Sequence, residues 1–269
     1  MPELPDLEAI RGFLNERLPG VRIEQAQALI PVVFRIPKAD LQAVLKGNTF
    51  GETLRQGKFL LFHFDSGHRM VVNPMLTGRF QYCLPQEKRR AKTCMALTLA
   101  DGWELRYVDE RLMGKVYLVG EDALEQIPQF AEMGPDALSP ELTEEVFAQR
   151  LRRHNGQTKS ILVNHRFVAG IGNAYADEIL FAAGIHPYRK RPALSEEEVS
   201  RLYQSIRSVF QWAIPIVAER TKDGLPREEV RDFLRVHRRG GEPCPNCGNR
   251  ITEVTAGQRI TSFCRHCQK

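Results

Sequence analysis

Four cysteines near the end of the chain have the spacing of a metal site. Cys244 and Cys247 form one CxxC pair, and Cys264 and Cys267 form a second pair after sixteen intervening residues. Two such pairs place four thiolates tetrahedrally around one Zn²⁺ ion, in a closed structural site with no position open for catalysis. The residues between the pairs alternate β-forming side chains, as a two-stranded ribbon requires. We therefore predict one structural Zn²⁺ here, with a redox role for the pairs as the alternative.

The N-terminus is the second group with a chemical use. The chain begins Met-Pro-Glu-Leu-Pro, and removal of Met1 would expose the secondary amine of Pro2. An α-amino group has a pKa of about 7.7–8.0, so a useful fraction is neutral near pH 7 and able to attack the anomeric carbon of a sugar. The product is a Schiff base, and Glu3 beside it would shuttle the proton. A proline that merely starts a helix is the alternative interpretation.

Basic side chains are concentrated in the same C-terminal segment as the cysteines. The chain has a formal net charge of +5, and residues 235–269 contain seven Lys and Arg residues against two Glu residues. Such a segment fits a polyanionic partner, whose phosphates it would neutralise. Arg259 lies between the two cysteine pairs, where a ribbon would present it to a phosphate. A solvated basic tail is the alternative.

The composition excludes a membrane-spanning protein. Apolar residues make up 42% of the 269 residues and charged residues 26%, as in an ordinary globular protein. No apolar run approaches the roughly 20 residues needed to span a bilayer. The first residues carry acids where a signal peptide carries positive charge. We therefore expect a cytoplasmic protein, in which Cys83 and Cys94 are buried structural thiols.

The first half of the chain is predicted to be rich in strands. A helix-like pattern covers residues 5–18, and Asp101-Gly102 is typical of a hairpin turn. Short runs of β-formers with little helix between them favour an antiparallel sandwich or barrel. These runs are residues 59–64, 95–99, 103–108 and 116–119.

The second half is predicted to be helical. Prolines and glycines in residues 121–140 are typical of a linker. Beyond them the apolar spacing becomes helical, in residues 143–154, 173–183 and 196–219. Ser195 and Glu198 have the spacing of a capping box at the start of the last helix, which Pro215 is expected to kink or end.

Several separate motifs, in order along almost the entire chain, resemble one family. The chain resembles the formamidopyrimidine-DNA glycosylase and endonuclease VIII family of base-excision enzymes. The matching stretches are residues 2–8 (PELPDLE), 56–60 (QGKFL), 109–111 with Gly114, 133–138 (MGPDAL), 168–178 (VAGIGNAYADE) and 241–244 (GEPC).

The resemblance implies an α+β fold with two lobes. An N-terminal antiparallel β-sandwich begins with a helix, and a helical C-terminal lobe carries a helix–two-turns–helix motif and a four-cysteine zinc finger. We expect the sandwich in residues 1–120, a linker in 121–140, the helical lobe in 141–234 and the zinc finger in 235–269.

The resemblance also implies roles for the residues that match the family's motifs. Pro2 would be the nucleophile and Glu3 the acid and base. Lys58 would contact a phosphate beside the lesion, and Asn173 and Arg259 would grip the kinked backbone.

Two further residues would fill the gap that a flipped nucleotide leaves. Met75, in the loop of residues 73–78, would wedge into the base stack, and Arg111 would hydrogen-bond the orphaned base.

The activity implied is that of a DNA glycosylase with AP lyase activity. The enzyme would bind double-stranded DNA with a damaged base or an abasic site, as a monomer in the bacterial cytosol. It would remove an oxidised or ring-opened base through a Schiff base at Pro2, followed by β,δ-elimination. A non-catalytic damaged-DNA-binding protein of the same fold is the alternative, and a zinc-ribbon protein-interaction module is a more distant one.

Three departures from the family pattern leave the lesion open. Asp6 stands where the purine-specific branch usually has Glu, and Leu112-Met113 replaces an aromatic residue. The connection of residues 221–233 is short and charged, where the 8-oxoguanine enzymes carry a longer glycine-rich lid. The missing lid argues against tight recognition of 8-oxoguanine and leaves oxidised pyrimidines and ring-opened purines. Lys159 would contact the flipped base or simply enter a helix.

Overall fold

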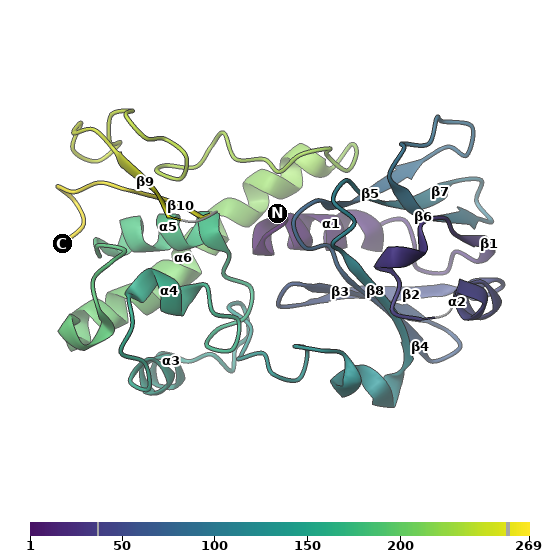
Figure 1. Cartoon of the computed structure of the whole chain (residues 1–269), viewed down its shortest axis with the longest axis horizontal. Helices are drawn as coiled ribbons and strands as arrows, with labels where there is room; N and C mark the ends of the chain where they lie inside the picture. Colours follow the sequence, from purple (N-terminus) through teal and green to yellow (C-terminus); the bar gives the residue numbers. More distant parts are fainter. Residues whose placement is uncertain (37, 257–258) are drawn as a thin grey trace. The chain divides into compact units, whose positions relative to one another are not determined.

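The computed structural model describes residues 1–36, 38–256 and 259–269, which fall into two compact units (Figure 1). The first unit contains residues 1–132 and 216–230, and the second contains residues 133–215 and 231–269. The division therefore falls within one helix, after Pro215. The domain boundaries expected from the sequence stay a prediction.

Two four-stranded antiparallel sheets form the first unit. One has the strand order β1-β6-β7-β5 and the other the order β2-β3-β4-β8. The strands are β1 (Ile23–Ala28), β2 (Phe50–Gln56), β3 (Phe59–Phe64), β4 (His68–Asn73), β5 (Gly78–Cys83), β6 (Thr93–Leu99), β7 (Glu104–Asp109) and β8 (Lys115–Gly120).

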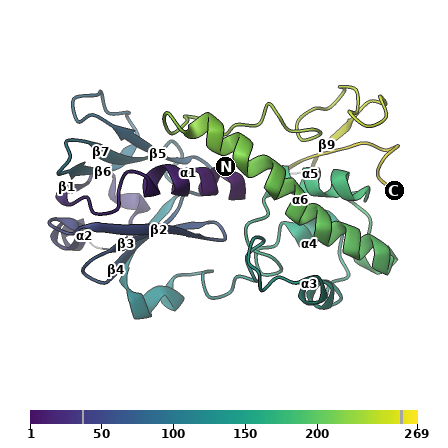
Figure 2. The ribbon, with the colours of Figure 1, turned by 180° about the vertical axis from the view of Figure 1, so that it is seen from behind.

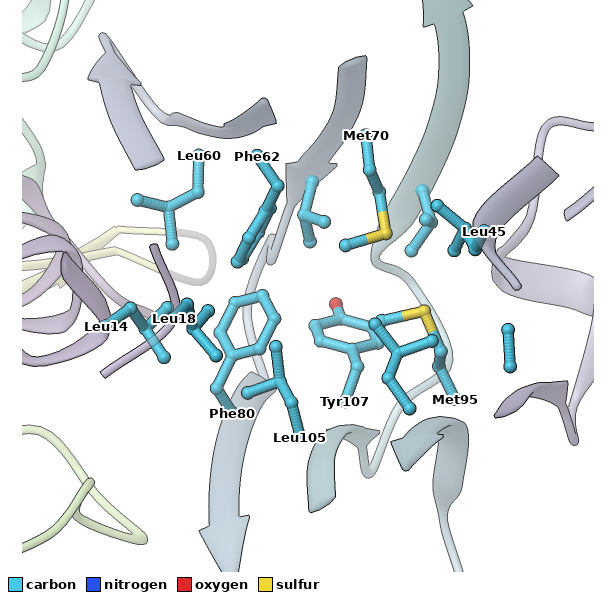
Figure 3. Close-up of a cluster of buried hydrophobic side chains, with 14 of the residues drawn as sticks. Leu14, Leu18, Leu45, Leu60, Phe62, Met70, Phe80, Met95, Leu105 and Tyr107 are labelled. Carbon is cyan, nitrogen blue, oxygen red and sulfur yellow. The ribbon is translucent and has the colours of Figure 1, made fainter. Parts of the chain in front are cut away.

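The core of this unit lies between the two sheets. Figure 3 shows Phe62 and Met70 of one sheet pointing toward Phe80, Leu105 and Tyr107 of the other. All five side chains are at most 3% exposed. The alternation of buried apolar side chains on facing strands is what drives two antiparallel sheets to pack as a sandwich.

Helix α1 (Leu4–Asn15) contributes its apolar side to this core. The helix ends three residues earlier than the sequence pattern predicts, before Pro19, which cannot donate the next helical hydrogen bond. Leu18 is nevertheless fully buried in the same core, which explains why the apolar spacing extends past the helix. The first unit also contains α2 (Lys38–Leu45) and the 3₁₀ helices η1 (Pro31–Val33) and η2 (Glu121–Gln126).

The predicted hairpin between β6 and β7 is confirmed. The two strands pair antiparallel, and Gly102 in their turn has a φ of +87°. A left-handed φ favours glycine, since a Cβ strains that conformation. Both cysteines of this unit are buried, as predicted, with Cys83 3% and Cys94 0% exposed.

Helices and one hairpin form the second unit. The start of its longest helix is the predicted capping box, because Ser195 and Glu198 each accept the other's backbone N–H. That helix, α6, continues for six residues beyond Pro215 (Figure 2). The elements are α3 (Glu144–Leu151), α4 (Thr158–Leu162), α5 (Asn173–Ala183), the 3₁₀ helix η3 (Arg191–Ala193), α6 (Glu196–Thr221), β9 (Thr252–Ala256) and β10 (Arg259–Phe263).

Candidate active site and nucleic-acid interface

The start of α1 determines where Pro2 lies. Pro2 is buried and immediately precedes Glu3, the N-cap of the helix. The backbone N–H of Glu3 donates to the Asp6 carboxylate at 2.7 Å, as one half of a capping box. Both carboxylates are only 7% exposed. The shorter Asp6 side chain is thus used as a helix cap, and two acidic groups lie close to Pro2.

The ammonium group of Met1 forms an ion pair next to this helix start. It contacts the Glu229 carboxylate, and the Arg79 guanidinium contacts the same carboxylate oxygen. Burial opposes the ionisation of Glu229, but the ammonium group and Arg79 outweigh it and lower the pKa of Glu229. While Met1 is attached, the Pro2 nitrogen belongs to a peptide bond, whose resonance removes its nucleophilic lone pair.

A pocket opens beside Pro2 within the first unit. Pro2, Asp6 and Arg79 line it together with residues from the connection that follows α6. Leu225 of that connection also packs against the core of the sandwich. Arg79 and Glu229 were not predicted as site residues, and the only sequence signal for Glu229 was the charge of its connection.

Lys58 projects from a tight turn between β2 and β3. Gly57 has a φ of +57°, which lets the chain reverse before the lysine. The Lys58 ammonium group donates to the Gln129 side chain at 2.6 Å. Partial burial, and then the neighbouring charge of Lys115, lower the pKa of Lys58. An anion placed beside Lys58 would favour its charged form.

One buried carboxylate fastens the loops of Met75 and Arg111 together. Asp109 is fully buried and accepts the backbone N–H of Gly114 at 2.6 Å and that of Arg111 at 3.2 Å. It also accepts the hydroxyl group of Thr77, from the loop that contains Met75. The bond from Thr77 joins residues that are 32 positions apart in the sequence. The Arg111 side chain itself is exposed.

The tyrosine hydroxyl of Tyr107 requires glycine on both of these loops. A Cβ at Gly78 would lie 2.2 Å from that hydroxyl oxygen, and a Cβ at Gly114 would lie 1.9 Å from it. Either contact is far inside van der Waals distance, so any other residue would displace the loop. The close approach of the two loops therefore depends on both glycines.

The loop of residues 73–78 presents two apolar side chains. Met75 has a φ of +49°, and its backbone N–H donates to the Asn73 side chain at 3.1 Å. Its neighbour Leu76 lines a second pocket, together with Met1 and Glu229. Leu76 was not predicted from the sequence, because two adjacent apolar residues in a turn have no periodicity that separates their roles.

Asn173 is the first residue of α5 and reaches toward the hairpin of the second unit. Gly172 is the N-cap of the helix, and Gly170 has a φ of +99°. The Asn173 side-chain amide donates to the Ile260 carbonyl at 2.8 Å. Because Ile260 follows Arg259, this bond ties the two predicted backbone-gripping residues together. Arg259 itself is exposed, at the start of β10.

A buried ion pair strengthens the same connection. The Lys159 ammonium group lies 2.7 Å from the Asp177 carboxylate and donates to the Ile260 carbonyl at 2.9 Å. Asp177 also contacts the His237 ring at 2.7 Å. Lys159 is 7% exposed, so its observed contacts hold the hairpin against α5. Asp177 and His237 were not predicted to have a role.

Glu178 fixes the segment that leads into the cysteine pairs. Its carboxylate accepts the three consecutive backbone N–H groups of residues 235–237, at 2.9 to 3.0 Å. Burial raises the pKa of Glu178, although these three hydrogen bonds act in the opposite direction. The motif around Asn173 therefore also positions the start of the metal-binding segment.

The four predicted cysteines converge on one point. Their sulfur atoms all lie within 4.8 Å of one another, and Cys244 and Cys267 are separated by 3.8 Å, Cys247 and Cys264 by 3.5 Å. A tetrahedral site with Zn–S bonds of about 2.3 Å has edges of about 3.8 Å, so the donors fit Zn²⁺. The Asn249 side chain donates to Cys247 and lowers the pKa of that thiol to about 6, which favours the thiolate.

The predicted ribbon and site residues are distributed over both units. β9 and β10 pair antiparallel between the cysteine pairs, which confirms the ribbon. His266 is exposed. Pro2, Glu3, Lys58, Met75 and Arg111 belong to the first unit, and Asn173, Arg259 and the cysteines belong to the second.

Comparison with known families accounts for nearly the whole chain. Residues 1–116 match the formamidopyrimidine-DNA glycosylase N-terminal domain, and residues 133–223 match the H2TH domain of that enzyme. Residues 241–269 match the zinc finger found in FPG and IleRS. The chain belongs to the formamidopyrimidine-DNA glycosylase family. This membership confirms the resemblance inferred from the motifs.

The chain is similar to individual members of this family over its full length. The chain is 39% identical over 274 residues to the formamidopyrimidine-DNA glycosylase of Symbiobacterium thermophilum, covering 100% of this chain and 89% of that one. It is 34% identical to the Pelotomaculum thermopropionicum enzyme, covering 100% and 99%. Lactococcus lactis Fpg in complex with N7-benzyl-Fapy-dG DNA superposes with a TM-score of 0.91 at 28% identity, covering both chains fully.

Family membership makes the protein a DNA glycosylase of base-excision repair. It also confirms the α+β fold with the β-sandwich, the H2TH domain and the four-cysteine zinc finger. The zinc finger match and the sulfur geometry assign one structural Zn²⁺ to the four cysteines. When bound, the ion stabilises the fold of the hairpin, which is too short to bury a core. Within the described residues, no helix has the length and apolar character to cross a membrane.

Proposed function

We propose that this glycosylase removes ring-opened or oxidised bases from double-stranded DNA and then cleaves the strand as an AP lyase. The nucleophile is the amine of Pro2, once Met1 has been removed. The observation that carries the proposal is the place of Pro2: it is buried directly before the N-cap of α1, beside two carboxylates and a pocket. A Lactococcus lactis relative has been crystallised with DNA that contains an abasic site.

The proposed reaction is the attack of a secondary amine, that of Pro2, on the C1′ carbon of a deoxyribose. The damaged nucleotide leaves the stack, because its C1′ is inaccessible in the duplex. The Pro2 nitrogen attacks C1′, the bond from C1′ to the base breaks, and the departing base takes a proton. The sugar ring opens to give an iminium ion. Loss of a proton from C2′ then breaks the C3′–O bond, and a second elimination breaks the C5′–O bond, with Glu3 as the acid and base.

The remaining site residues bind DNA in this proposal. Lys58 contacts a phosphate beside the lesion, and Arg259 and Asn173 hold the backbone. An amide nitrogen has two N–H donors, so Asn173 keeps one for a phosphate while the other bonds Ile260. Arg111 pairs with the orphaned base.

An apolar side chain of the 73–78 loop fills the gap in the stack. Met75 is the residue that matches the family by its type, and Leu76 is the one that lines the pocket beside Met1. The loop is held rigidly through Thr77 and Asp109, as a wedge requires.

We propose further that the enzyme acts as a monomer in the bacterial cytosol. The relatives described above come from bacteria. Sedimentation of the protein with and without duplex DNA tests the stoichiometry, and a two-to-one complex would contradict it.

Borohydride trapping on a duplex with an abasic site tests the nucleophile. Protein shown by mass spectrometry to lack Met1 should form a covalent adduct, because borohydride reduces the iminium ion irreversibly. Pro2→Gly retains an amine of the wrong geometry and should lose most of the adduct. Preparations that retain Met1 should bind the duplex without an adduct.

If protein without Met1 also fails to form an adduct, the alternative of a damaged-DNA-binding protein replaces the lyase.

A further inference from the structure

We propose that Glu229 is a positioning residue for the N-terminal nucleophile: its carboxylate, held by Arg79, accepts the N–H of the Pro2 amine and directs the lone pair of that amine toward the sugar. The inference rests on the proposed function, because it needs Pro2 as the nucleophile. No motif of the sequence assigns a role to Glu229 or to Arg79.

The contacts of Glu229 place a carboxylate at the terminal amine. The Met1 ammonium group contacts one oxygen of Glu229, and Arg79 contacts the same oxygen. The Glu229 side chain is 18% exposed and that of Arg79 is 14% exposed, so water screens this group of charges only partly. Removal of Met1 moves the terminal nitrogen by one residue along the chain, about 3.8 Å, and Pro2 already lines the same pocket as Glu229.

The segment that carries Glu229 is fastened to the sandwich at two points. Leu225 packs against the core of the first unit, and Glu229 pairs with Arg79 of β5. Both contacts lie within the first unit. The carboxylate is therefore delivered to the amine by a short segment with an apolar and an ionic anchor.

A neutral proline amine needs this kind of partner. It has one N–H and one lone pair, so a hydrogen bond that fixes the N–H also fixes the direction of the lone pair. The same carboxylate stabilises the cationic iminium ion that follows the attack. Charge-assisted hydrogen bonds of this type have the geometric specificity that positioning requires.

Other charged groups near the terminus also influence the pKa of the terminal amine. Glu3 and Asp6 of α1 are the nearest carboxylates in sequence, and each already takes part in the capping box. The remaining charged residues that line the two pockets are Arg79, Arg90, Glu110, Arg227 and Glu228.

Glu229→Gln in protein without Met1 tests the proposal through the pH profile of single-turnover imine trapping. The maximal rate should fall about tenfold, because a charge-assisted hydrogen bond is lost. The ascending limb of the profile should move to lower pH by roughly half a unit to one unit, since a carboxylate favours the ammonium form and its loss lowers the pKa of the amine. Glu229→Asp should restore the position of the limb in part.

Two controls separate this role from a structural one. Asp223→Asn removes one carboxylate charge from the same segment, at an exposed residue that lines neither pocket, and should keep the wild-type profile. Leu225→Ala loosens the segment at its apolar anchor and should move the limb less than Glu229→Gln does, because Arg79 still holds the carboxylate. An unshifted limb in Glu229→Gln, with normal trapping by the wild type, would overturn the role of Glu229 alone. Absence of trapping in every protein, the wild type included, would overturn the proposed function instead.

Discussion

Asp109 is the residue on which the arrangement of the loops of Met75 and Arg111 depends. A fully buried carboxylate is costly unless each oxygen is hydrogen-bonded. Asp109 meets that condition with the hydroxyl group of Thr77 and the backbone N–H groups of Arg111 and Gly114. Its requirement for donors thus draws together the loop of Met75 and the loop of Arg111.

Single substitutions can show whether Met75 or Leu76 is the side chain that enters the base stack. We expect Leu76→Ala to lower the rate of base excision from duplex DNA by about tenfold to a hundredfold, because an apolar side chain of this size contributes roughly 1.5–3 kcal/mol when buried. Met75→Ala should have a smaller effect, since Leu76 lines the pocket beside Met1. Single-turnover kinetics with a formamidopyrimidine duplex measure both.

The matching control is cleavage of an abasic site in single-stranded DNA. No base stack has to be filled there, so both variants should cleave it at the wild-type rate. A larger loss in Met75→Ala than in Leu76→Ala on the duplex would show that Met75 is the wedge, as the sequence predicts.

The connection after α6 is the element that bears on lesion choice. It is short, and Leu225 and Glu229 hold it against the sandwich. A segment anchored in this way has little length left to fold over a flipped purine. Tight recognition of a base depends on hydrogen bonds that such a cover provides.

We therefore expect 8-oxoguanine to be excised about tenfold more slowly, or worse, than the preferred lesion. Parallel rates on formamidopyrimidine, thymine glycol, dihydrouracil, 5-hydroxyuracil and 8-oxoguanine duplexes, all under single-turnover conditions, provide the measurement. Equal or faster excision of 8-oxoguanine would show that the enzyme recognises this base without a longer lid.

At the scale of the whole molecule, the proposed function assigns the chemistry and the backbone contacts to different units. Pro2 and Lys58 lie in the unit of the sandwich, while Asn173, Arg259 and the zinc site lie in the other. Each unit has its own buried core residues. The loss of one set of contacts need not unfold the other unit.

Removal of zinc tests this division of roles. A chelator strong enough to take Zn²⁺ from four thiolates should abolish specific binding to duplex DNA, because the hairpin that carries Arg259 depends on the metal for its fold. The thermal transition of the sandwich should persist, as followed by the fluorescence of Trp103 of the first unit in protein whose other tryptophan, Trp212 of the second unit, is replaced by Phe.

Re-addition of Zn²⁺ should restore the affinity, and Arg259→Ala with zinc bound should reproduce most of the loss. Full retention of DNA affinity after verified removal of the metal would contradict a role for the finger as a clamp.

The sequence by itself determined the elements whose information is local. The two CxxC pairs specified a zinc site, because ligand type and spacing suffice for a closed tetrahedral centre. β3 and α5 have the predicted limits, since a run of β-formers and a glycine-bounded helical period are read directly from neighbouring residues. The motifs around Pro2, Lys58 and Asn173 were sufficient to identify the family.

Only the tertiary structure decided which side chains meet across long separations. Glu229 reaches Arg79 over 150 positions, and Asp109 reaches Thr77 over 32. Such pairs leave no periodic pattern, because a charged residue in a loop has the same local sequence whether solvent or a partner surrounds it. The sequence thus determined a glycosylase with a zinc finger and with a proline, Pro2, just before its first helix. The packing of the connection against the sandwich decided what surrounds that proline.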